Sequence, residues 1–134
     1  MSDKTVRILF VCNGNTCRSP MAAAMAAARL GSTAEVQSVG IESGSDAKAT
    51  QDAVRVMSER GLDISNHRSS EIDDVDITAF DIVVAMSPAI AQRVEQLNPK
   101  RLVRWSVSNP HGCGMEAYRA AADAIETSLE GLNL

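Results

Sequence analysis

The fold is decided near the beginning of the chain by the stretch VRILFVCNGNTCRSP, residues 6–20. Its first part, Val6 to Val11, is apolar except for Arg7, as expected of a central strand in a parallel sheet. Its last part, Ser19-Pro20, predicts a helix start, because serine caps helices and proline suits the first helical position. The stretch therefore predicts a strand, a tight turn and a helix in immediate succession.

The rest of the chain repeats this alternation of strand and helix. Further strands are predicted at 35–39, 81–86 and 102–107, and helices at 20–30, 50–60, 88–97 and 115–132. Such alternation predicts an α/β fold, a three-layer domain with a central four-stranded parallel sheet. No linker or repeat divides the chain, so residues 1–134 are expected to form one domain. Parallel sheets bind ligands at the carboxyl ends of their strands, which directs attention to the turn after the first strand.

Composition narrows the class of protein. The 134 residues are 45% hydrophobic and 22% charged, with a formal net charge of −4, as in soluble globular proteins. No apolar run approaches the ~20 residues of a membrane span, and Met1 to Thr5 lacks the apolar region of a signal peptide. The acidic balance without a basic cluster argues against nucleic-acid binding. Three cysteines fit a reducing compartment better than a disulfide framework, so we expect a cytoplasmic protein without membrane or nucleic-acid partners.

The turn itself reads Cys12-Asn13-Gly14-Asn15-Thr16-Cys17-Arg18-Ser19. Asparagine and glycine tolerate left-handed backbone angles, which aim successive N–H groups into a concavity that binds an anion. The following helix adds its N-terminal dipole, and Arg18 adds a planar fork that matches phosphate oxygens. Sites of this kind also favour a cysteine thiolate. The turn therefore predicts attack by Cys12 on a bound phosphoryl group.

Other interpretations of these residues are weaker. Cys12 alone is also compatible with a small buried hydrophobic residue at a strand end. A zinc site from Cys12, Cys17, His111 and Cys113 is disfavoured, because His111-Gly112-Cys113 is a poor second half of a zinc motif. A nucleotide-binding P-loop is excluded, since no Gly-Lys-Ser/Thr follows the glycine. We therefore predict neither a metal nor a cofactor.

The motif Cys-x5-Arg-Ser at residues 12–19, followed by Pro20, resembles the phosphate-binding loop of the low-molecular-weight protein tyrosine phosphatases. The resemblance covers nearly the whole chain. It implies the family's fold and hydrolysis of a phosphorylated protein or small phosphorylated substrate through a phosphocysteine. Further segments that resemble the family are Ser38-Val39-Gly40, residues 61–68, residues 81–86 and, in place of the Asp-Pro acid loop, Asn109-Pro110-His111-Gly112.

The resemblance implies a role for each loop residue. Cys12 is the nucleophile, and Ser19 hydrogen-bonds its thiolate and helps it leave. Ser38 and His67 support the left-handed turn together with Asn15. The residues implied to hold the phosphoryl oxygens are Asn13, Gly14, Asn15, Thr16, Cys17 and Arg18.

Cys17 resembles a second loop cysteine that traps oxidised Cys12 as a reversible disulfide. A cysteine that merely packs in the loop is the alternative.

Asn109 stands where the family has the aspartate that protonates the leaving group. Asparagine cannot do this, and general acid catalysis contributes ~10²–10⁴-fold. Either catalysis is weak on poor leaving groups, or His111 replaces the acid, or the substrate needs no acid. A purely conformational role of Asn109 in its turn is a further alternative.

Substrate recognition also departs from the tyrosine-directed members of the family. The resemblance implies that the tyrosine-directed members line the rim of the cleft with aromatic residues. The segment at residues 41–48, which resembles that rim, has none. Thr16 resembles the loop threonine of the protein arginine phosphatase branch, where it contacts the guanidinium. The resemblance therefore implies phosphotyrosine or phosphoarginine as substrate and leaves the choice open.

Two alternatives to a phosphatase stay open. The first is an arsenate reductase on the same fold, because arsenate fits the loop and needs no general acid. The reductases that this fold resembles use further cysteines after the third strand, and residues 86–97 contain none. The second is a catalytically impaired phosphate-binding module.

Overall fold

The computed structural model describes residues 5–42 and 46–134. The expectations for residues 1–4, and for 43–45 within the rim, lie outside these ranges. The strands are β1 (Val6–Cys12), β2 (Ala34–Gly40), β3 (Ile82–Ala85) and β4 (Leu102–Arg104). The helices are α1 (Arg18–Leu30), α2 (Gln51–Glu59), α3 (Pro88–Glu95) and α4 (Met115–Glu130), with short 3₁₀ helices η1 (Gly31–Thr33), η2 (Ile72–Asp74) and η3 (Ile77–Ala79).

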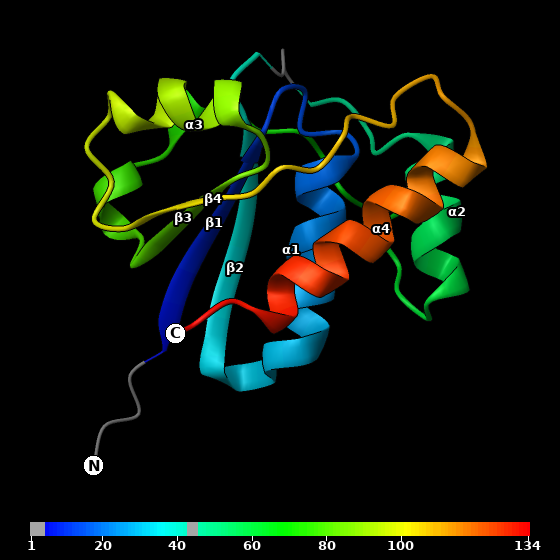
Figure 1. Cartoon of the computed structure of the whole chain (residues 1–134), viewed down its shortest axis with the longest axis horizontal. Coiled ribbons are helices and arrows are strands. Elements are labelled where there is room, and N and C mark those ends of the chain that lie inside the picture. The colour runs from blue at the N-terminus through cyan, green and yellow to red at the C-terminus, as the bar shows by residue number, and fades with distance from the viewer. Residues whose placement is uncertain (1–4, 43–45) are drawn as a thin grey trace.

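The four strands form one sheet in the order β2-β1-β3-β4, and every pairing is parallel. Helices α1, α4 and α2 lie on one side of the sheet and α3 lies on the other (Figure 1). The predicted three-layer α/β fold is confirmed. The chain leaves β1 toward β2 on one side and returns to β3 on the other, so the carboxyl end of β1 is the switch point at which such sheets bind ligands.

The core surrounds β1. Residues 8–12 are buried without interruption, as the apolar run predicts for a strand covered on both faces. The molecule's few aromatic side chains all belong to this core. They are Phe10, Phe80, Trp105 and Tyr118, and each is at most 7% exposed. The cleft at the end of β1 therefore has no aromatic wall.

Two of the predicted helix starts are confirmed by their caps. The hydroxyl of Thr50 accepts a hydrogen bond from the backbone N–H of Ala53, and the hydroxyl of Ser87 accepts one from Ile90. The predicted cap at Ser19 is wrong, because α1 already begins at Arg18. The Ser19 hydroxyl is occupied by tertiary partners described below.

Strand β4 is shorter than predicted and ends at Arg104 rather than at Val107. The neighbouring chain still follows β3, since the backbone N–H groups of Trp105 and Val107 donate to Ala85 and Met86. Residues 105–107 therefore leave the regular strand yet stay beside the sheet, where the carbonyl of Val107 reaches the site.

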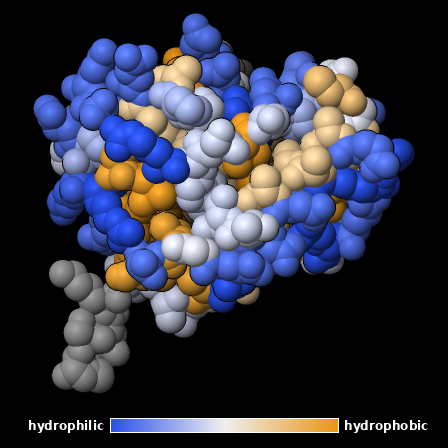
Figure 2. Space-filling model, in the orientation of Figure 1, coloured by the Kyte–Doolittle hydropathy of each residue, from blue (hydrophilic) through white to orange (hydrophobic). Residues whose placement is uncertain are grey.

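Hydrophilic residues occupy most of the periphery of the face shown in Figure 2, and hydrophobic residues lie between them and reach the outline at the lower left. Within residues 5–42 and 46–134, no helix is long and apolar enough to cross a membrane. Among the same residues, Leu134 is the one large hydrophobic side chain classed as exposed.

Candidate active site

The loop between β1 and α1 is fixed to the chain around it. The backbone N–H of Ile41 donates to the carbonyl of Cys12 at 3.0 Å, and that of Thr50 donates to Thr16 at 2.9 Å. Of the three residues predicted to tolerate left-handed angles, only Asn15 has a positive φ, at 55°. The turn therefore depends on a single left-handed residue.

The side chain of Asn15 is completely buried and explains why this conformation persists. Its Nδ2 donates to the hydroxyls of Ser19 at 2.8 Å and Ser38 at 3.0 Å, and its Oδ1 accepts from the N–H of Ser70 at 2.8 Å. Its carbonyl lies 2.7 Å from Nε2 of His67, which must donate. The structure thus brings Asn15, Ser38 and His67 together, and these bonds offset the cost of a left-handed asparagine.

Cys12 lies buried at the bottom of the loop with two donors beside its sulfur. The Ser19 hydroxyl is 2.9 Å from Sγ, and the N–H of Asn15 is 3.3 Å from it. Because Asn15 already donates to the Ser19 oxygen, the hydroxyl proton of Ser19 is available to Sγ, with the Val39 carbonyl more distant at 3.4 Å. The sulfur of Cys12 is therefore held in place by two hydrogen-bonding groups of its own loop.

Arg18 is 4% exposed, although it carries a full charge. One guanidinium nitrogen donates to the carbonyl of Val107 at 3.0 Å. Its Nε is buried and has no hydrogen-bond partner within the described part of the chain. A buried N–H without an acceptor is costly unless a ligand completes it, so this donor points to an anion.

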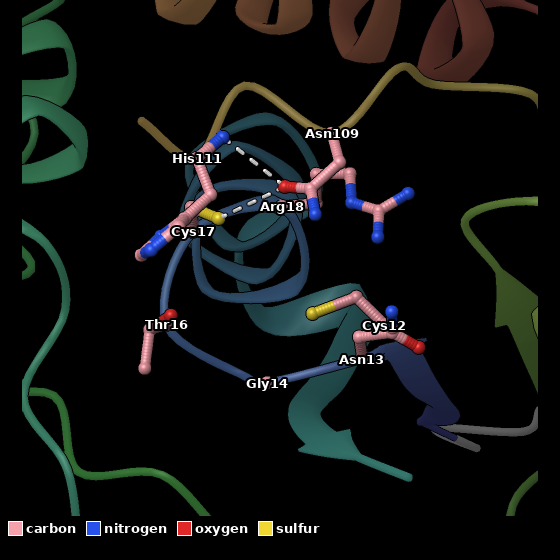
Figure 3. A pocket seen from close by; sticks show the side chains of 8 residues that line it. All are labelled: Cys12, Asn13, Gly14, Thr16, Cys17, Arg18, Asn109 and His111. Atoms are coloured by element: carbon pink, nitrogen blue, oxygen red, sulfur yellow. Dashed lines mark hydrogen bonds between the residues drawn. The ribbon is translucent and has the colours of Figure 1, made fainter. Parts of the chain in front are cut away.

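Most of the predicted loop residues line one cavity (Figure 3). Asn15 and Ser19 are not among the residues that line it, and both are completely buried. No carboxylate is among the side chains that line it, so its electrostatic character is set by the guanidinium and by N–H and O–H groups. The lining residues are Cys12, Asn13, Gly14, Thr16, Cys17, Arg18, Asn109 and His111.

Cys17 differs from Cys12 in its surroundings. Burial raises the pKa of the Cys17 thiol, and the nearby Cys12 raises it further. Cys17 therefore stays protonated at neutral pH, and its thiol donates to Oδ1 of Asn109 at 3.7 Å. Both cysteines line the same cavity, whereas Cys113 is exposed outside it. The reversible disulfide between Cys12 and Cys17 stays a prediction.

Asn109 forms hydrogen bonds both within the loop at residues 109–112, which stands in place of the family's acid loop and keeps that name below, and to the loop after β1. Its Oδ1 accepts from the N–H of His111 at 3.2 Å as well as from the Cys17 thiol. In Figure 3 the ring of His111 lies on the side of Thr16 and Cys17, across the cavity from Cys12. Among the residues that the structure describes, no cluster of three or more His, Cys, Asp or Glu side chains could hold a metal ion.

The model of the low molecular weight phosphotyrosine protein phosphatase family matches residues 7–133. The chain belongs to this family. The resemblance inferred from the loop motif is thereby confirmed, and the protein is an enzyme, a low-molecular-weight protein phosphatase.

The relatives of this phosphatase carry different names. It is 35% identical to a protein-arginine-phosphatase of Geobacillus stearothermophilus, over 94% of this chain and 93% of that protein. It is equally 35% identical to an arsenate reductase 2 of Staphylococcus haemolyticus, over 97% and 96% of the two chains. The solved YwlE arginine phosphatase of G. stearothermophilus superposes with a TM-score of 0.82 at 34% identity, covering 93% of this chain and 88% of the other. The relatives alone therefore do not decide the substrate.

Several groups that hold the phosphatase loop were not predicted. The carbonyl of Val107 and the N–H groups of Thr50 and Ser70 are backbone groups, which carry no signal in residue type. The side chain of Tyr118 is buried in the core, yet its hydroxyl lies 2.9 Å from the hydroxyl of Thr50 at the start of α2. Burial raises the pKa of Tyr118, so its hydroxyl stays a neutral hydrogen-bonding group at this junction.

Proposed function

We propose that the phosphatase hydrolyses phosphorylated protein side chains, or small phosphorylated molecules, through a phosphocysteine on Cys12. Phosphotyrosine and phosphoarginine are the two side chains implied by its family and by its named relatives. The observation that carries the proposal is the combination of a sulfur with two donors beside it and a buried, unpartnered Arg18 Nε lining one cavity.

In the first step the phosphoryl group enters the cavity and accepts hydrogen bonds from Arg18 and from the N–H groups of residues 13–18. The Cys12 thiolate attacks phosphorus, the sulfur–phosphorus bond forms, and the bond to the leaving group breaks with its electron pair departing on that group. Arg18 keeps its hydrogen bonds to the equatorial oxygens in the transition state, where fixed donors are most effective.

In the second step water attacks phosphorus and the sulfur–phosphorus bond breaks. The electron pair returns to Cys12, and both protons of the water stay on the released phosphate. The hydroxyl of Ser19, 2.9 Å from the sulfur, stabilises the departing thiolate. Neither step requires a cofactor. We place the reaction in the cytoplasm, where the free thiols of Cys12 and Cys17 stay reduced.

Replacement of the nucleophile tests this proposal. Cys12→Ser is expected to lower kcat on an aryl phosphate by more than about 10⁴-fold while phosphate still binds, because Arg18 and the loop N–H groups are unchanged. Cys113→Ala, which alters an exposed cysteine outside the cavity, serves as the matched control and is expected to keep full activity. Turnover that survives in Cys12→Ser would exclude the phosphocysteine.

The same preparation separates the phosphatase from an arsenate reductase. Formation of arsenite from arsenate consumes two electrons, which thiols must supply and a reductant must restore. The helix after β3, residues 88–95, contains no cysteine that could accept a disulfide from the loop. We expect phosphate release without arsenite formation in the presence of a dithiol, and arsenite formation at a comparable rate would favour the reductase.

A further inference from the structure

The orientation of the Asn109 amide carries information about the leaving group. Its Oδ1 accepts two donors, the N–H of His111 and the thiol of Cys17. A backbone N–H can only donate, so the oxygen and nitrogen of this amide are fixed by their partners. Figure 3 shows the amide nitrogen turned toward the side of the cavity where Cys12 and Arg18 lie. Within the described residues, no acceptor receives a hydrogen bond from this nitrogen.

Asn109 therefore presents an N–H donor where the family's acid loop presents a carboxyl group. An amide N–H can bond to an oxygen that gains negative charge, but it cannot transfer its proton. The group that leaves beside it must depart as an anion. Only a leaving group of low basicity does this readily, since a poor one depends on general acid catalysis worth ~10²–10⁴-fold.

The same donor is unfavourable for a guanidinium. Phosphoarginine presents N–H groups on its leaving side and must leave as a cation, which needs acceptors and negative charge. The lining side chains include no carboxylate, and Arg18 adds a positive charge. Phosphotyrosine meets a second obstacle, because every Phe, Tyr and Trp side chain is buried in the core, which leaves the His111 imidazole as the flat side chain that lines the cavity.

Resting on the proposed phosphocysteine mechanism, we infer that Asn109 makes this cleft selective for acyl phosphates, in which phosphate is joined to a carboxylate. The leaving carboxylate has a pKa of ~4 and departs without a proton. Its departing oxygen accepts the N–H of Asn109. The thiolate of Cys12 takes the phosphoryl group, the phosphorus–oxygen bond breaks with its electron pair on the carboxylate, and water then releases phosphate and the thiolate.

The selectivity is measured as kcat/KM on four substrates, namely acetyl phosphate, a phosphoaspartyl peptide, phosphotyrosine and phosphoarginine. Rates are corrected for spontaneous hydrolysis with Cys12→Ser as the blank. Both acyl phosphates are expected to exceed phosphotyrosine and phosphoarginine by at least about 100-fold. A higher value for the peptide assigns the site to protein aspartyl phosphates, and a higher value for acetyl phosphate assigns it to small molecules.

Asn109→Asp removes the donor and keeps the shape and both acceptor contacts. It is expected to raise kcat/KM for phosphotyrosine by ~10²-fold or more, while that for acetyl phosphate stays within a few-fold. The control is Asn98→Asp, which adds the same charge at an exposed position after α3, toward the opposite end of the sheet. It is expected to change none of the ratios, and thermal melts of both variants establish that they fold.

The outcomes separate the two proposals. If p-nitrophenyl phosphate is not hydrolysed at all, the proposed function fails. If it is hydrolysed while phosphoarginine or phosphotyrosine matches acetyl phosphate, only the acyl phosphate inference is overturned. Selective loss of phosphotyrosine activity in His111→Ala would then identify His111 as the proton donor.

Discussion

The two loops that face each other across the cavity are built in opposite ways. In the loop after β1, Cys12, Asn15, Arg18 and Ser19 are buried and bonded to one another or to the sheet. In the loop before α4, residues 108–109 and 111–114 are exposed, and the Asn109 oxygen bonds this loop to Cys17 of the first loop. The loop that surrounds the phosphoryl group is thus held by many buried contacts. The loop that faces the leaving group is exposed, so its side chains are less constrained by their neighbours.

This difference assigns separate tasks to the two loops. Preorganised donors stabilise a transition state because they need not reorganise as charge develops, and the buried loop meets that condition. The exposed loop adds only an amide and an imidazole to the cavity. Changes in the first loop are therefore expected to reduce the rate for every substrate, and changes in the second to alter the ratios between substrates.

Arg18→Lys is expected to have the largest effect on the buried side of this comparison. Lysine keeps the charge but has no planar fork, so it cannot donate two parallel bonds to phosphate while a further nitrogen bonds the Val107 carbonyl. We expect kcat to fall by ~10²–10³-fold for good and poor leaving groups alike. The measurement is steady-state kinetics on aryl phosphates. A loss confined to poor leaving groups would contradict the separation of tasks.

Asn15→Ala tests how firmly the buried loop is held. It leaves the Ser70 N–H without its acceptor and places alanine at a φ of 55°, so the free energy of unfolding is expected to fall by about 2–4 kcal/mol. Asn98→Ala is the matched control, because Asn98 has a φ of 57° and is exposed. Its cost is expected to be only the backbone strain of about 1–2 kcal/mol. Equal losses in urea unfolding would show that the buried network adds nothing.

The smallest expected effect is a pH dependence from Cys17, the residue that joins the two loops. Its pKa is raised by burial, so the unfolded chain loses this proton first as the pH rises. Protonated Cys17 therefore contributes to the free energy of unfolding. This contribution is fully present below pH ~8.5, where an ordinary cysteine is protonated, and it is lost as the pH rises from that value to the raised pKa of Cys17. Urea unfolding at pH 8 and 10 is expected to show a smaller decrease in Cys17→Ala than in Cys113→Ala. Identical decreases would argue against a buried thiol.

The sequence predicted the parts of this molecule that depend on nearby residues. The apolar run at 6–11 and the alternation of strands and helices that follows it each led to elements that the structure contains. The predicted cap at Ser19 is wrong because its hydroxyl bonds Cys12 and Asn15 within the same loop. The loop motif had implied the contact with Cys12, so the general preference of serine for caps was the weaker guide at this position.

The site shows the same limit. The motif predicted which side chains surround the phosphoryl group, because their spacing along one loop fixes their proximity. It did not predict that the Val107 carbonyl would anchor Arg18, or that Cys17 and His111 would orient Asn109. The contacts of Val107 with Arg18 and of Cys17 with Asn109 join segments 89 and 92 residues apart, and they depend on how the chain after β4 follows the sheet.

Rapid-quench kinetics on a series of aryl phosphates with leaving groups of different pKa measures directly whether Cys12 displaces the leaving group without a general acid. We expect a rate of phosphoenzyme formation that falls steeply as the leaving group becomes more basic, with a burst of the released phenol for the most acidic ones. Asn109→Asp should flatten that slope. Equal rates for good and poor leaving groups in the unchanged enzyme, with no burst and no phosphocysteine, would contradict it.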